Sequence, residues 1–136
     1  MEITVSEHAG EKTITILHID GYLDSSNYTQ LIDQAQELFS LGTENLLLDM
    51  EKCGFISSAG LRAFYGIAMI MRGNGPPDSS QVWTTFSEMR AEIDKMTGAC
   101  CKILNLQPKV KQSLEITGIL KYLDIYNDLE TALASF

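Results

Sequence analysis

The chain has 136 residues, 45% of them hydrophobic and 21% charged, which is the size and composition of one globular domain that buries its core without disulfides or a metal. Its net charge of −8 at pH 7 argues against nucleic acid and against an anionic membrane surface as partners, because their phosphates repel an acidic chain. A basic protein partner is compatible with this charge. The three cysteines, an odd number that includes one adjacent pair, predict reduced thiols in a cytosolic protein.

The N-terminal segment predicts a β-hairpin. Residues 2–8 alternate between apolar and polar side chains, and residues 13–19 are rich in β-branched side chains, with a turn between them. The acidic, alternating start of the chain is unlike a signal peptide. The longest apolar run, Ile67–Met71, is far too short to span a bilayer, so no membrane segment is expected.

A helix is predicted after the hairpin. Apolar residues recur at helical spacing over residues 28–39, the segment 21–26 with its polar caps precedes them, and Gly42 suits the C-terminal end. Within the polar segment, Asp24 is interpreted as a cap of this helix.

The next stretch, Leu46–Leu61, predicts a strand, a loop and the start of a second helix. Residues 46–48 are an apolar triplet short enough for one buried strand, and apolar residues recur on one helical face from Leu61 to Met71. At the junction, either Ser57 or Ser58 can cap the first helical N–H groups. A group placed there lies against the positive end of the helix dipole.

The rest of the chain alternates between the two kinds of element. Within residues 74–98 we expect a loop, a short β-prone segment with Trp83, and a helix over 88–96. A strand at 99–104, a helix from Pro108 to Gly118, a strand at 121–125 and a final helix follow, the last with a capping-box start at Asn127 and Glu130. Strands that alternate with helices after a hairpin predict an α/β fold with one mixed sheet of four or five strands packed by four or five helices.

Nothing in the sequence favours an enzyme. Both histidines lie in the predicted hairpin, and no Gly-x-Ser-x-Gly elbow surrounds Ser57 or Ser58. The glycine motifs of phosphate-binding and dinucleotide-binding loops are absent from the sequence, and the cysteines lack the spacing of a zinc site. We therefore expect no catalytic residues, no metal and no cofactor.

The order and spacing of five residues resemble the signature of STAS domains, the modules shared by bacterial anti-sigma factor antagonists and the tails of sulfate transporters: Asp49, Ser57, Ser58, Gly60 and Leu61. The Gly-Tyr-Leu-Asp string at 21–24 is similar to the family's Gly-x-Leu-Asp, and residues 99–136 resemble the end of STAS domains. The resemblance implies a single STAS domain over 1–136, in which 74–98 is an extra helical insertion between the second helix and the following strand.

The resemblance also implies a function, that of a bacterial, cytoplasmic anti-sigma factor antagonist. In that family a serine is phosphorylated by a partner kinase, and alignment of the Gly-Leu pair places this serine at Ser58. Ser57, which stands where the family has an aspartate, offers a second hydroxyl and is the second choice. Unmodified, the chain is expected to bind an anti-sigma factor that is a serine kinase, until phosphorylation ends the interaction and a phosphatase restores it. The implied docking surface contains Asp24, Phe55, Ile56, Ser57, Ser58 and Gly60.

An alternative interpretation gives the partner contact to the insertion. In this hypothesis the chain is an unphosphorylated scaffold or a subunit of a sensor complex, and it binds through residues 74–98. Apolar residues at helical spacing in this segment can pack on their own domain, contact a partner or a second copy, or belong to a loop. The sequence leaves these three open, and with them the oligomeric state, a dimer included.

Overall fold

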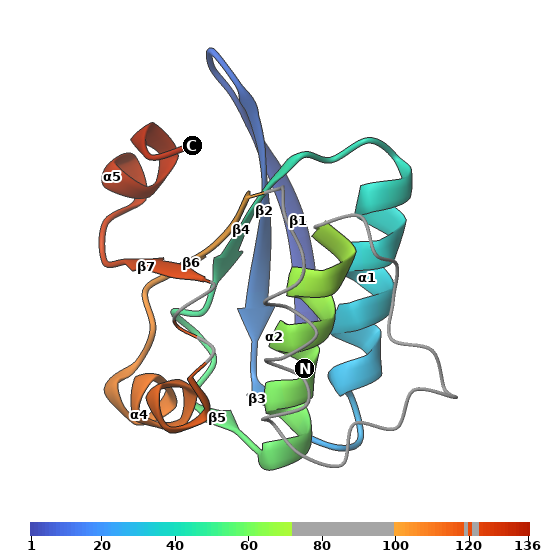
Figure 1. Cartoon of the computed structure of the whole chain (residues 1–136), viewed down its shortest axis with the longest axis vertical. Helices are drawn as coiled ribbons and strands as arrows, with labels where there is room; N and C mark the ends of the chain where they lie inside the picture. The colour runs from blue at the N-terminus through green and yellow to red at the C-terminus, as the bar shows by residue number, and fades with distance from the viewer. Residues whose placement is uncertain (72–99, 119, 121–122) are drawn as a thin grey trace.

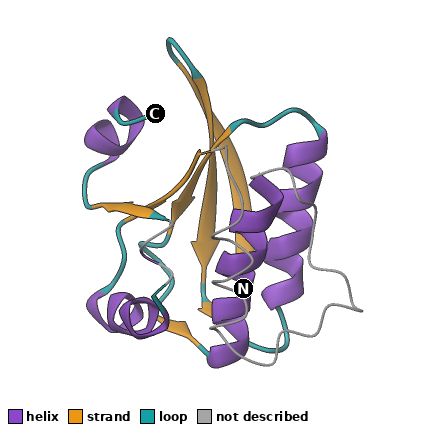
Figure 2. Ribbon diagram, viewed as in Figure 1, coloured by secondary structure: helices purple, strands orange, loops and turns teal. Residues whose placement is uncertain are grey.

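A computed structural model describes residues 1–71, 100–118, 120 and 123–136 of the chain (Figures 1 and 2). The expected insertion at 74–98, with its β-prone segment and its helix, lies outside the described residues. So do residues 121 and 122 of the last predicted strand.

A five-stranded mixed sheet forms the centre of the fold, which confirms the predicted architecture. Its strands are β1 (Glu2–Ala9), β2 (Thr13–Asp20), β4 (Asn45–Asp49), β6 (Cys100–Leu104) and β7 (Asp124–Tyr126). They lie in the order β1-β2-β4-β6-β7, and only the β1–β2 pair is antiparallel. The carboxyl ends of β2, β4, β6 and β7 therefore lie at the same end of the sheet.

Four helices are found in the described part of the chain: α1 (Tyr28–Ser40), α2 (Ser58–Met71), α4 (Pro108–Thr117) and α5 (Leu129–Ala134). Side chains on one face of the sheet, such as Leu17, Leu48 and Ile103, share the main core with α1, α2 and α4. The opposite face forms a smaller core with α5, around Ile16 and Leu47. In Figure 1, α1 and α2 lie side by side on one side of the sheet and α5 lies on the other.

The second helix is buried more completely than the sequence pattern predicts. The spacing of apolar residues predicts one buried face, but eleven of the 14 residues of α2 are buried, from Gly60 to Met71 with the exception of Arg62. A helix that is apolar all round belongs inside a protein. Small residues are buried along α2 together with the large ones: Ala63, Gly66 and Ala68. The helix therefore has apolar positions on every side.

Two predicted helix caps are wrong by a few residues. The N-cap of α1 is Asn27, and Asp24 lies three residues earlier in a turn. The N-cap of α5 is Asp128 in place of Asn127, because the Asp128 carboxylate accepts the Thr131 N–H at 3.0 Å. That bond also explains why the capping-box pattern gave the wrong N-cap. The carboxylate of Asp128, one residue after Asn127, caps the same helical turn.

A second, two-stranded parallel sheet was not predicted. It consists of β3 (Tyr22–Leu23) and β5 (Phe55–Ile56), which lie at the lower end of the molecule in Figure 1. Each strand is only two residues long, so neither has a periodicity that sequence analysis can detect.

Candidate functional site

The candidate site begins where the chain leaves the carboxyl end of β4. The Met50 N–H donates to the Leu104 carbonyl at 2.9 Å, which ties the following loop to β6. Cys53 is buried in this loop, and burial raises the pKa of its thiol, so the thiol stays neutral at neutral pH. The backbone of this loop is therefore held in place on its way to the serines, and its cysteine is unreactive.

The small β3–β5 sheet brings the Gly-Tyr-Leu-Asp string to the serines. Leu23 pairs with Ile56, and the Ser57 N–H extends this ladder by donating to the Leu23 carbonyl at 2.9 Å. Because Asp24 directly follows Leu23, the register places Asp24 level with Ser57. Two segments more than thirty positions apart in the sequence thus meet at one point.

Gly60 allows α2 to pack directly on the backbone of β3. A Cβ atom at this position would lie 2.6 Å from the Leu23 carbonyl oxygen and 3.0 Å from Leu23 Cγ. Side chains essentially never approach other atoms so closely, so only glycine fits without movement of the backbone. Gly60 is buried. Its role is to hold the helix start against β3, and it is not itself a contact surface.

The two serines have different environments. The Ser57 hydroxyl accepts the Gly60 N–H at 3.1 Å and so caps the first turn of α2, and the residue is half-buried. Ser58 is the first residue of α2 and is exposed, and its hydroxyl makes no hydrogen bond to any residue that the structure describes. The question of which serine caps the helix is therefore answered: Ser57 does, and the Ser58 hydroxyl remains accessible.

Asp24 is held as a carboxylate by its own turn. Its Oδ1 accepts the Ser26 N–H at 2.9 Å and the Ser26 hydroxyl, and these bonds hold the pKa of Asp24 below its ordinary value of 3.8. The Asn27 side chain completes the turn by accepting the Asp24 N–H at 2.9 Å. At neutral pH the turn beside the serines therefore carries a fixed negative charge.

An exposed aromatic pair lies on the same small sheet. Tyr22 is 64% exposed and Phe55 is 52% exposed, and their rings meet edge to face with centroids 6.0 Å apart. Ile56, the next residue after Phe55, is buried and anchors β5. Tyr22 was not among the residues predicted for the docking surface; its only signal in the sequence was its place inside the Gly-Tyr-Leu-Asp string.

His18 does not contact the candidate serines. Its Nδ1 lies 2.8 Å from Asp49 Oδ2, and its Nε2 lies 2.8 Å from the Ser6 hydroxyl. This Ser-His-Asp series joins β1, β2 and β4 on the sheet face that α5 also covers. It links the edge strand β1 to the centre of the sheet and leaves Ser57 and Ser58 without a histidine base.

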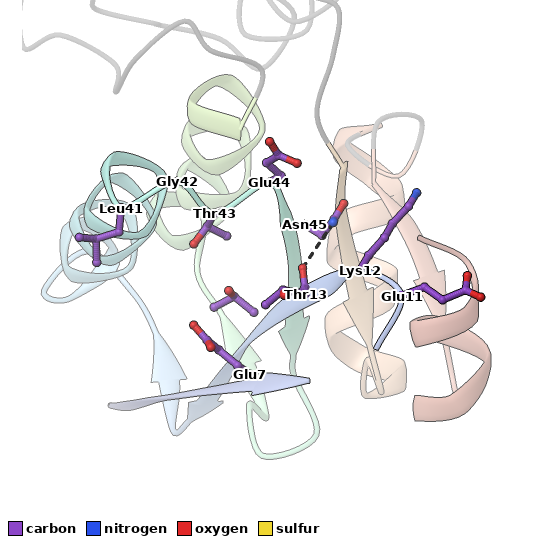
Figure 3. A pocket seen from close by; sticks show the side chains of 10 residues that line it. Glu7, Glu11, Lys12, Thr13, Leu41, Gly42, Thr43, Glu44 and Asn45 are labelled. Carbon is purple, nitrogen blue, oxygen red and sulfur yellow. Dashed lines mark hydrogen bonds between the residues drawn. The ribbon is translucent and has the colours of Figure 1, made fainter. Parts of the chain in front are cut away.

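A cavity lies at the other end of the sheet. It has a volume of about 520 Å³ and lies beside the amino ends of β2 and β4 (Figure 3). The residues that line it include Glu7, Glu11 and Glu44, and Figure 3 shows several carboxylates around it. Its acidic lining disfavours anions such as phosphates, and the candidate serines are absent from its walls.

The part of the chain that the structure describes contains neither a candidate membrane span nor a candidate metal cluster. None of its helices has both the length and the apolar composition needed to cross a membrane. No group of three or more histidine, cysteine, aspartate or glutamate side chains there is placed to hold a metal ion.

Comparison with protein families gives a match for the first half of the chain. The family model of the STAS domain matches residues 5–75, a segment that runs from β1 through the serines to the end of α2. Over the full 136 residues, the chain is 25% identical to BtrV of Bordetella bronchiseptica, a protein provisionally named an anti-sigma factor antagonist. The match covers 100% of this chain and 95% of BtrV.

Solved structures with the same fold include anti-sigma factor antagonists. One from Thermotoga maritima, provisionally described as such, has a TM-score of 0.66 at 14% identity and covers 96% of this chain and 92% of that one. The phosphorylated form of the Bacillus protein SpoIIAA has a TM-score of 0.58 at 13% identity, over 98% and 100% of the two chains. SpoIIAA has also been solved unphosphorylated, under the description of an anti-sigma factor antagonist. At these identities the likeness shows the fold alone.

Proposed function

We propose, on the premise that this chain belongs to the STAS domain family, that it is an anti-sigma factor antagonist switched off by phosphorylation of Ser58. In its unmodified form it binds an anti-sigma factor that is a serine kinase, and the sigma factor is released. The place of action is the bacterial cytoplasm, where sigma factors meet RNA polymerase. We treat residues 1–136 as one STAS domain with an insertion at 74–98, and we assign it no reaction of its own.

The observation that carries the proposal is the difference between the two serines. A phosphoryl acceptor needs a hydroxyl that a kinase can reach, and the exposed Ser58 hydroxyl is unengaged among the described residues. Ser57 is the weaker candidate, because its half-buried hydroxyl caps α2 and its modification would remove that cap. The relatives support the same kind of switch, since SpoIIAA, which shares the fold, has a phosphorylated form.

The proposed switch reaction is a phosphoryl transfer from ATP. The Ser58 oxygen forms a bond to the γ-phosphorus, the bond from that phosphorus to the ADP oxygen breaks, and the hydroxyl proton is released. A phosphatase reverses the modification by hydrolysis, which returns the hydroxyl and inorganic phosphate. Each cycle consumes one ATP in the partner and leaves the chain unchanged.

Phosphorylation at this position changes the surface and not the fold. The phosphoryl group adds about −1.5 to −2 charges at neutral pH. At the start of α2 this charge faces the positive end of the helix dipole, so the helix tolerates it. A partner packed against the unmodified serine instead meets a charged, hydrated group, and it loses affinity through desolvation and repulsion.

The proposed docking surface divides into contacts and supports. Phe55 and Ser58 are exposed and face a partner directly, and Asp24 adds a carboxylate that suits a basic partner surface. Ile56 and Gly60 are buried, so they fix the geometry of the surface from below. Tyr22 extends the apolar part of the contact through its pairing with Phe55.

The proposal is tested by measuring how tightly this chain binds each purified serine-kinase anti-sigma factor encoded in the same genome. We expect one of them to bind the parent chain and to label it with the γ-phosphate of ATP. Ser58→Asp should weaken this binding by at least tenfold, or about 1.4 kcal/mol. Ser58→Ala should bind like the parent and accept no phosphate, whereas the matched control Ser57→Ala should still be labelled. Tight binding by Ser58→Asp, or labelling of Ser58→Ala, contradicts the proposal.

The same binding assay distinguishes the proposed switch at Ser58 from the alternative, in which the chain is an unphosphorylated scaffold. If residues 74–98 carry the partner contact, their deletion abolishes binding while substitutions at Ser58 leave it unchanged. If the proposal is right, the Ser58 variants separate as described above, and Phe55→Ala weakens binding because it removes an exposed contact.

A further inference from the structure

Only two side chains of α2 are exposed. Eleven of the 14 residues are buried, Ala59 is half-buried, and the remaining two, Ser58 and Arg62, are open to solvent. They lie four positions apart. Residues at this spacing lie one above the other on the same face of a helix, with Cβ atoms about 5–6 Å apart.

Arg62 is the single charged residue of α2, in a chain whose net charge is −8. Despite this acidic background, it forms no ion pair with any carboxylate in the described ranges. The guanidinium group of Arg62 thus has donors that are unengaged among the residues that the structure describes. One helical turn N-terminal to it, on the same helix face, lies the hydroxyl of Ser58, which makes no hydrogen bond to a described residue.

We propose that Arg62 binds the phosphoryl group carried by Ser58, so that the modified serine and the arginine form one surface ion pair. This inference rests on the proposed phosphorylation of Ser58 and specifies how the chain receives the phosphate. The planar guanidinium donates two parallel N–H bonds to phosphate oxygens, a geometry that lysine lacks. The order, with the anion N-terminal and the cation C-terminal, is the favourable one on a helix.

With this ion pair, phosphorylation changes the exposed face of α2 in two ways: it adds the phosphate charge and it engages the guanidinium of Arg62. In the unmodified chain, the exposed face of α2 presents a neutral hydroxyl and one positive charge to a partner. After modification the phosphate adds negative charge, and the ion pair occupies the guanidinium donors that were available before. A partner that binds Arg62 of the unmodified chain therefore loses this contact when Ser58 is phosphorylated.

A direct test installs phosphoserine at position 58 of the full chain through an expanded genetic code, which makes it independent of any kinase. The second ionisation of the phosphate, near pH 6 in an unpaired group, is then followed by ³¹P NMR as the pH is raised. In the parent we expect this ionisation at a pH about 0.15 to 0.35 of a unit lower than in Arg62→Gln, because the guanidinium stabilises the dianion. Arg62→Lys should recover part of the shift, and high salt should shrink it.

Lys52→Gln is the matched control, since it removes one positive charge from an exposed residue of the loop that precedes the site. Its titration should follow the parent within about a third of the Arg62→Gln shift. The proposal is overturned if Arg62→Gln titrates like the parent, or if Lys52→Gln shifts the ionisation as much. These outcomes concern the pair alone: absence of phosphate on Ser58 in cells would retire the proposed function and would leave the measured pairing as it is.

Discussion

Replacement of Gly60 by alanine sets two effects of known size against each other. In the interior of an exposed helix, Gly→Ala stabilises by about 0.5–1 kcal/mol, because glycine has more backbone freedom to lose on folding. At position 60, however, the new methyl group would lie 2.6 Å from the carbonyl oxygen of Leu23. That oxygen belongs to the backbone and already accepts the Ser57 N–H, so it cannot rotate away.

The steric effect should win. Overpacking of a rigid site costs about 1–3 kcal/mol and the helix gain offsets about 0.5–1 kcal/mol, so Gly60→Ala should lower the free energy of unfolding by about 1 kcal/mol, the difference between the midpoints of the two ranges. Because α2 must then move away from β3, the position of Ser58 relative to Asp24 changes as well. Binding of the anti-sigma partner should therefore weaken even at temperatures where the variant is folded.

Urea denaturation followed by circular dichroism measures this prediction. Gly10→Ala is the matched control, because a methyl group in that turn would meet its nearest neighbour, the His8 side chain, at an ordinary 3.5 Å. We expect Gly10→Ala to change stability by less than about 0.5 kcal/mol. If Gly60→Ala is as stable as the parent or more stable, the close approach of α2 to β3 is refuted.

Three further predictions concern the packing around the site. Lys102→Met should cost about 2 kcal/mol and speed hydrogen exchange in α5, because the buried ammonium donates to the carbonyl and the hydroxyl of Ser135 at 2.8 and 3.0 Å; unchanged exchange would contradict it. Tyr65→Phe should cost about 1–2 kcal/mol in urea, because its hydroxyl donates to the buried Thr117 carbonyl at 2.9 Å, and a parent-like midpoint would refute this. Asp128→Ala should lower the melting temperature above pH 4 and have a vanishing effect at lower pH. The hydroxyl and N–H of Thr131 hold the pKa of Asp128 below its ordinary 3.8, so the cap stabilises fully above that value and is lost as the pH falls through the lowered pKa; an equal effect at all pH values would count against the cap.

Much of the fold could be predicted because its long elements have strong periodic patterns. The β-branched run over residues 13–19 and the helical spacing over 28–39 both form the expected elements, and the helix buries the face that its spacing indicates. Gly118 ends α4 at a φ of +78°, a conformation that glycine adopts without strain, as the sequence indicates.

The geometry of the site depends on contacts that no local pattern encodes. β3 and β5 are two residues long, and they pair beside the close contact between α2 and Leu23, which joins residues far apart in the sequence. The sequence offers two adjacent serines as caps of one helix, and only the three-dimensional path decides that Ser57 takes the Gly60 N–H. Likewise, the pairing of His18 with Ser6 and Asp49 depends on the order of three strands.

The most direct test of the account is phosphosite mapping of this chain recovered from its own cells, during growth and under stress. Cleavage after Lys52 and Arg62 yields one peptide, residues 53–62, that contains both serines, and fragmentation between Ser57 and Ser58 separates the two sites. We predict phosphate on Ser58, with an occupancy that differs between the two conditions. Full coverage of this peptide with no phosphate in either condition, or with phosphate on Ser57 alone, would contradict it.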